Sequence, residues 1–181
     1  MLHFIYTQPL SRVIIAMAIS IAIWGYAQTK LYGKRWNIAN ALLACGMVMA
    51  ILCITIFGRT AGERILILKP FASLTVARTQ SEAYRELLMN IFLFFPLGLT
   101  LSNALPQSWG RWRRIGLTVT IGLLLSAGIE YTQYRFALGV AETDDVICNT
   151  LGVFIGSTSL LIAHGIEKYK EKTIKHDSNK N

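Results

Sequence analysis

Carboxylate and amide side chains recur at helical spacing inside long apolar stretches of this sequence. Ser126, Glu130 and Gln133 occupy positions i, i+4 and i+7, which share one face of a helix. Asp145 and Asn149 share a face in the same way further along the chain. Positioned carboxylates can act as general acids or bases. Because an ionised side chain at the centre of a bilayer costs about 2.5–3.5 kcal/mol on insertion scales, a carboxylate inside an apolar span is a candidate functional residue.

The candidate functional cluster contains Asn90, Glu130, Gln133, Glu142, Asp145 and Asn149. Within the cluster, Glu130 and Asp145 are the candidate catalytic residues, with acid–base roles. We expect Glu130, Asp145 and Asn149 to meet in one cleft, because helical spacing gives each a defined face at a similar depth. A basic residue at the rim, Arg135 or Arg85, would neutralise the two carboxylates there.

Structural roles are the alternative for several of these residues. Asp144 and Asp145 could do no more than complement the dipole of a helix that is capped by Thr143. That interpretation is favoured for Asp144 and less so for Asp145, which continues a polar face. Glu130 has the weakest structural alternative, because Gln133 beside it indicates a partner that the two side chains share.

Small residues and one proline predict how the helices pack. Gly152 and Gly156 form a G-x-x-x-G pattern, which lets a second helix approach closely. Pro96 and Gly98 predict a kink, with the freed carbonyl groups met by neighbouring side chains. For Asn149, the structural alternative is a hydrogen bond between helices and no further role.

Five stretches without charged residues define the elements that must position these side chains; they are 13–29, 36–58, 87–110, 115–129 and 146–166. A membrane span needs about 20 mostly apolar residues. The fourth stretch reaches that length only if it continues through Glu130 to Tyr134. The chain is 53% hydrophobic and 15% charged, a balance that one soluble core could not bury. These features predict an all-α, polytopic membrane bundle of about five transmembrane helices over residues 1–166.

Basic residues are divided unequally between the two sides of such a bundle. Eleven of the 18 Lys and Arg residues fall on the side of the C-terminus. The positive-inside rule therefore predicts a plasma-membrane protein with its N-terminus outside and its C-terminus in the cytoplasm. The net charge of +8 then favours contact with anionic membrane lipid and not with nucleic acid. Residues 167–181 should form a polar cytoplasmic tail, frayed or lying on the surface, because they lack a periodic apolar face.

The longest connection, residues 59–85, contains an apolar segment around Pro70 and Phe71. The segment is too short to cross a bilayer, and Pro70 biases the residue before it away from helix. We therefore expect an interfacial or re-entrant segment on the outer side of the membrane.

Sequence motifs for metals, phosphates and activated serines are missing from the chain. There is no H-x-x-x-H, no paired cysteines, no phosphate loop and no G-x-S-x-G. Oxygen ligands for Mg²⁺ or Ca²⁺ could come from Glu130, Glu142 and Asp145 with Asn149, but this signal is weak. We therefore expect neither a metal nor a cofactor.

The ordered set of motifs resembles the VanZ-like family of membrane proteins. The motifs are Pro70-Phe71 in the outer loop, Asn90, Phe94, Pro96 and Gly98, then Ser126, Glu130 and Gln133, then Glu142, Asp145, Asn149-Thr150, Gly152 and Gly156. They extend over residues 56–156, and the stretch 136–149 is similar to the teicoplanin-resistance member of that family. The chain departs from the common pattern at Ile67, where relatives often have Asn, and lacks an Arg near Gly139.

This resemblance implies a membrane factor that contributes to glycopeptide resistance, teicoplanin in particular, at the outer face of the cell membrane. An enzyme that acts on a lipid-linked cell-envelope molecule is the first alternative, with Glu130 and Asp145 as acid–base residues. A small transporter is the second alternative, although the sequence has no inverted repeat. The expected partners are membrane lipid and either a glycopeptide antibiotic or a lipid-linked cell-wall precursor.

Overall fold

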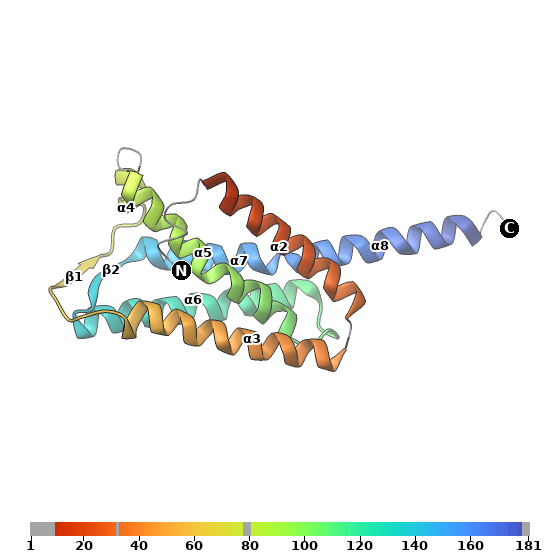
Figure 1. Cartoon of the computed structure of the whole chain (residues 1–181), viewed down its shortest axis with the longest axis horizontal. Coiled ribbons are helices and arrows are strands. Elements are labelled where there is room, and N and C mark those ends of the chain that lie inside the picture. Colours follow the sequence, from red (N-terminus) through yellow and green to blue (C-terminus); the bar gives the residue numbers. More distant parts are fainter. Residues whose placement is uncertain (1–9, 32, 78–80, 179–181) are drawn as a thin grey trace.

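The computed structural model describes residues 10–31, 33–77 and 81–178, and most of them are helical (Figure 1). The long helices are α2 (Leu10–Lys30), α3 (Lys34–Leu52), α5 (Ser81–Ala104), α6 (Arg111–Phe136), α7 (Thr143–Ser157) and α8 (Ser159–Ser178). A π-helical turn, η1 (Cys53–Phe57), extends α3. Five helical segments are long and apolar enough to cross a membrane, with α7 and α8 counted as one. The predicted all-α membrane bundle is confirmed.

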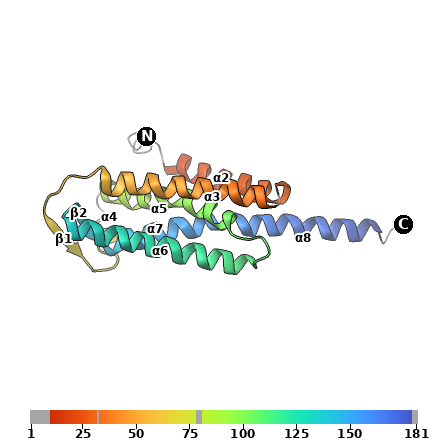
Figure 2. The ribbon, with the colours of Figure 1, turned by 90° about the horizontal axis from the view of Figure 1, so that it is seen from below.

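The fourth and fifth spans extend beyond their apolar stretches. Helix α6 continues through Glu130 to Phe136, as its length requires. The polar composition after Ile166 predicts a frayed or surface-lying tail, but α8 instead continues as a helix to Ser178 and projects beyond the bundle (Figures 1 and 2). A helix satisfies its own backbone hydrogen bonds, and the Glu171–Lys175 spacing supports it, so exposed polar residues can prolong it.

The closest helix packing in the bundle joins α5 and α7. A Cβ atom added to Gly152 would lie 2.1 Å from the carbonyl oxygen of Ile91, and one added to Gly156 would lie 2.2 Å from that of Phe95. Gly98 approaches a carbonyl oxygen of α7 just as closely, at 2.1 Å. The glycines thus lie where the predicted packing role requires them, and any side chain there would separate the helices.

Pro96 lies inside α5 without ending it. The hydroxyl of Thr100 donates to the carbonyl oxygen of Pro96 at 2.9 Å, so a side chain meets a backbone carbonyl at this point. The kink expected here stays a prediction.

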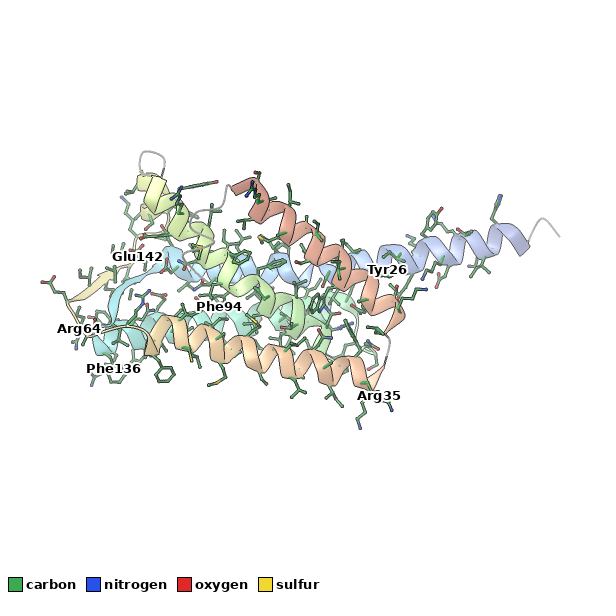
Figure 3. The ribbon with its side chains drawn as sticks, in the orientation of Figure 1. Tyr26, Arg35, Arg64, Phe94, Phe136 and Glu142 are labelled. Carbon is green, nitrogen blue, oxygen red and sulfur yellow. The ribbon has the colours of Figure 1, made fainter. Side chains whose placement is uncertain are left out.

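The other helices surround the α5–α7 pair. Helix α3 packs on α5, α6 packs on α7, and α2 packs on α8 (Figure 2). The buried apolar centre consists of Ala44, Ile51, Phe94, Leu97, Ile129 and Val153. Figure 3 shows Phe94 in the middle of the bundle, between Glu142 at one end and Arg35 at the other.

A small parallel sheet and a short helix close the end of the bundle that we call the loop end. Strand β1 (Arg64–Ile67) pairs in register with β2 (Gly139–Glu142), and helix α4 (Ala72–Ala77) follows β1. The sequence pattern predicts an interfacial or re-entrant segment around Pro70 and Phe71. In the structure this segment is strand β1 followed by a turn. Gly139 begins β2 with φ of 131°, a conformation that favours glycine. Figure 1 shows α4, β1 and β2 at the same end of the bundle.

Candidate functional site: an acidic cleft at the loop end

A cavity of about 400 Å³ lies at the loop end, between η1, α5, β2 and the start of α7. We call it the acidic cleft, and its charged and hydrogen-bonding side chains are Thr55, Arg59, Ser73, Glu86, Asn90, Glu142 and Asp145. Three carboxylates face one guanidinium, so the ionised side chains leave an excess of negative charge. Apolar residues of η1 and α5 complete the wall.

Asp145 and Asn90 meet in this cleft, as the predicted cluster requires. The Asn90 Nδ2 group donates to Oδ1 of Asp145 at 2.6 Å. Asp145 lies in the first turn of α7, two turns before Gly152, on the face that packs against α5. The close approach of the glycines therefore brings the Asp145 carboxylate to the Asn90 amide.

Glu142 is the last residue of β2 and lines the cleft beside Asp145. Its carboxylate accepts a hydrogen bond from the Ser73 hydroxyl at 2.5 Å. Its backbone N–H donates to Oε2 of Glu130 at 3.0 Å. Glu142 is thus fixed between α4 and α6, and its half-buried carboxylate faces the cavity.

Glu130 occupies a different position from the one that its spacing predicts. The residue is only 8% exposed, and it lines a neighbouring hollow with Tyr131 and Tyr134 instead of the acidic cleft. It still interacts electrostatically with Asp145 and Arg59. The expectation that Glu130 and Asp145 line one cleft is therefore wrong, because β2 lies between the Glu130 carboxylate and the cavity.

Asn149 also lies outside the cleft, one turn deeper in α7. Its Nδ2 group donates to the Ser126 hydroxyl at 2.9 Å, which links α7 to α6. Gln133 donates instead to the carbonyl oxygen of Thr55 at 3.0 Å, so Gln133 and Glu130 do not share a partner as predicted. The polar face of α6 therefore forms hydrogen bonds with three other elements, α7, β2 and η1, at successive turns.

Asp144 holds the Pro70-Phe71 motif. Its two carboxylate oxygens accept the backbone N–H groups of Phe71, at 2.5 Å, and Ser73, at 2.8 Å, at the start of α4. Phe71 takes a left-handed conformation with φ of 62°. The dipole role predicted for Asp144 is therefore incomplete, because its carboxylate also fixes the connection between η1 and α5.

The predicted N-cap of α7 is wrong by one residue. Glu142 is the N-cap, and the Thr143 hydroxyl donates to the carbonyl oxygen of Ile67 at 3.4 Å. The Thr143 side chain thus joins α7 to β1 instead of capping its own helix.

Arg59 is the cation of the cleft, and the sequence pattern did not single it out. It interacts electrostatically with Asp145 and Glu130, and its Nη1 group lies 3.4 Å from the carbonyl oxygen of Leu138. The sequence predicts Arg135 or Arg85 for this role, but the guanidinium of Arg135 lies over the Phe136 ring, 5.8 Å from the centroid. The position of Arg59 after the second span was the available signal, but only the fold brings it to α7.

Metal binding has no support in the described part of the chain. Among residues 10–31, 33–77 and 81–178, no three His, Cys, Asp or Glu side chains are grouped so that they could hold a metal ion. Two carboxylates of the cleft instead accept hydrogen bonds, Glu142 from the Ser73 hydroxyl and Asp145 from the Asn90 amide.

The five apolar helices and the polar cleft at one end define the class as a polytopic membrane helix bundle. The model of the VanZ/LLP1 family matches residues 13–164. The chain therefore belongs to the VanZ/LLP1 family. It is similar to Protein VanZ of Enterococcus faecium, with 33% identity over 96 residues, which cover 52% of this chain and 51% of the relative. The matched stretch thus spans about half the length of that relative, and no solved structure matches the chain.

Proposed function

We propose that this protein confers or contributes to glycopeptide resistance, teicoplanin in particular, at the outer face of the plasma membrane. The observation that carries the proposal is an acidic cleft in a chain of the VanZ/LLP1 family. The distribution of basic residues supports an outward-facing loop end, since most Lys and Arg residues lie at the other end. Glycopeptides act outside the membrane, so the cleft would be accessible to them.

The chemistry of the cleft favours a ligand with an amino group and an apolar tail. Glu86, Glu142 and Asp145 would attract an ammonium group. A second hollow of about 360 Å³ adjoins the cleft and shares Glu142 with it. Its wall includes Leu66 and Leu68, so it is suited to an acyl chain. A lipid-tailed glycopeptide has both features, whereas three carboxylates would repel the diphosphate of a lipid-linked cell-wall precursor.

Expression of the chain in a teicoplanin-sensitive host tests this proposal directly. We expect the inhibitory concentration of teicoplanin to rise more than that of vancomycin, because only teicoplanin carries the acyl chain. Glu142→Gln and Asp145→Asn should lower the teicoplanin effect at normal membrane abundance, since each removes a charge that would contact the ligand. Removing such a contact weakens binding about tenfold.

Glu63→Gln is the matched control, because Glu63 is an exposed carboxylate at the loop end, outside the wall of the cleft. It should leave resistance unchanged. Equal effects on both drugs, or full resistance in a Glu142→Gln/Asp145→Asn double variant of normal abundance, would contradict the proposal.

An enzyme acting on a lipid-linked envelope molecule is the second candidate. The observation that favours it is the Asp145 carboxylate, which lines a cavity while Asn90 holds it in one orientation. Asp145 and Glu142 are better placed than Glu130 for acid–base work, because the Glu130 carboxylate faces β2. An enzyme would lose all activity in Asp145→Asn, whereas Glu130→Gln would lower abundance and activity together.

A further inference from the structure

A second polar cavity, of about 250 Å³, lies at the opposite end of the bundle from the acidic cleft. Side chains of α2, α6, α8 and the α5–α6 connection line it, and the ones that matter here are Gln28, Gln107, Trp109, Arg111, Arg114 and Glu167. We call it the basic-end cavity, because most of the Lys and Arg residues of the chain lie at this end. Nothing in the proposed resistance function depends on this cavity.

Positive charge converges on the basic-end cavity from the first turn of α6. Arg114 is only 3% exposed, and its Nε and Nη2 groups donate to the carbonyl oxygen of Ser102 at 3.0 and 2.8 Å. Arg111, one turn earlier, lines the same cavity. The N-terminus of a 26-residue helix adds its partial positive charge at the same place. The combined field favours an anionic group.

Two amide side chains in the wall leave hydrogen-bonding atoms unmatched. Oε1 of Gln107 accepts the backbone N–H of Gly33 at 3.0 Å, which fixes the amide, and its buried Nε2 group has no partner among the described residues. Gln28 is 8% exposed, and its buried Oε1 atom likewise has no partner in the described part. Buried polar atoms normally have hydrogen-bond partners. Nε2 of Gln107 and Oε1 of Gln28 are therefore a donor and an acceptor that a ligand in this cavity could satisfy.

We propose that the basic-end cavity binds the headgroup of a phospholipid that carries a hydroxyl or ammonium group beside its phosphate. The phosphate would accept hydrogen bonds from Arg111 and from Nε2 of Gln107. The hydroxyl or ammonium group would donate to Oε1 of Gln28 and to Glu167. Phosphatidylglycerol and phosphatidylethanolamine have this chemistry, whereas phosphatidylcholine lacks a donor.

The position of the cavity along the helices also fits a lipid headgroup. It lies where α2 ends and α6 begins, at the boundary between apolar spans and basic connections. Trp109 belongs to its wall, and tryptophan is enriched at the level of membrane headgroups. Leu160 and Ala163 line the side nearer the apolar core, where the acyl chains would begin.

Lipid binding to the purified full-length protein in detergent tests the proposal, with native mass spectrometry as the readout. We expect phosphatidylglycerol and phosphatidylethanolamine to be retained in preference to phosphatidylcholine. Arg111→Gln should weaken phosphatidylglycerol binding about tenfold. Gln107→Glu should do the same, because it keeps the acceptor for Gly33 but replaces the buried donor with a negative charge.

Arg35→Gln is the matched control: it removes the same charge at the same end of the bundle, but Arg35 is exposed on α3 and lies outside the wall of the cavity. Its effect should stay below about twofold. Equal losses in Arg111→Gln and Arg35→Gln would overturn the proposal, and so would equal retention of the three lipids. Arg111-dependent binding of inorganic phosphate without binding of lipid would overturn the lipid assignment and identify a soluble phosphate compound instead.

Discussion

Asp144 and Asp145 are adjacent in the chain but serve different parts of the molecule. Successive residues on a helix are about 100° apart, so one side chain faces α4 and the other faces α5. The Asp144 carboxylate fixes the connection between η1 and α5 through Phe71 and Ser73, while the Asp145 carboxylate meets Asn90 in the acidic cleft. The pair therefore separates a structural function from a candidate chemical one within one helical turn.

Asp144→Asn should loosen the connection between η1 and α5. The variant replaces one acceptor oxygen with a donor that faces a backbone N–H, and an unsatisfied buried group costs about 1–3 kcal/mol. The measurement is the rate of chymotryptic cleavage after Phe71, which is 58% exposed and lies just before α4, in detergent-solubilised protein. We expect faster cleavage in Asp144→Asn.

The neighbouring substitution is the control for that experiment. Asp145→Asn removes the same charge at the adjacent position but leaves both hydrogen bonds to the loop in place. Chymotryptic cleavage after Phe71 should therefore match that of the unmodified chain. Equal cleavage rates in the two variants would show that the hydrogen bonds of Asp144 do not stabilise the loop.

At the scale of elements, the α5–α7 contact determines the geometry of the cleft. Gly152→Ala should destabilise the bundle, because the added Cβ would lie 2.1 Å from the Ile91 carbonyl oxygen and the two helices would have to separate. Overpacking of this kind costs about 1–3 kcal/mol. A lower melting temperature of the solubilised protein and lower membrane abundance would record this loss.

Gly128→Ala is the matched substitution on α6. An added Cβ at Gly128 meets nothing within 4 Å among the described atoms, and alanine favours a helix over glycine by about 1 kcal/mol. Its stability should be unchanged or higher. A Gly152→Ala protein as stable as Gly128→Ala would show that the close approach of α5 and α7 is dispensable.

At the scale of the whole molecule, the two ends of the bundle carry opposite chemistry. The loop end holds the carboxylates of the acidic cleft, and the other end holds the arginines of the basic-end cavity, with α8 projecting beyond it (Figure 2). A membrane with anionic lipid on its inner leaflet would favour the basic end inside.

The orientation of the bundle is tested with reporters fused to the C-terminus. Five spans put the termini on opposite sides, so we expect the C-terminus in the cytoplasm, where a fluorescent reporter matures and a phosphatase reporter is inactive. A phosphatase fused after residue 60, in the connection that is predicted to lie outside, is the positive control. Strong phosphatase activity at the C-terminus would reverse the predicted orientation and place the acidic cleft inside.

The spans and the glycine contacts could be predicted because they are local properties of the chain. The length of an apolar stretch defines a span, and the Gly152–Gly156 spacing marks a face that a neighbouring helix can approach, whichever helix that is. The meeting of Asn90 and Asp145 follows from that contact. The tail from Lys168 was misjudged because polar composition does not by itself end a helix that the bundle has already begun.

The sequence by itself therefore determined the membrane class, the helices and the chemical types at the loop end. Only the tertiary structure decided which side chains share a cavity. The Arg64–Gly139 strand pairing and the Phe71–Asp144 hydrogen bond join segments more than 70 residues apart. Such contacts depend on the rotation of each helix about its axis and on the path of the loop. Local spacing encodes neither of them. The sequence therefore did not predict that Arg59 lines the cleft and that Glu130 does not.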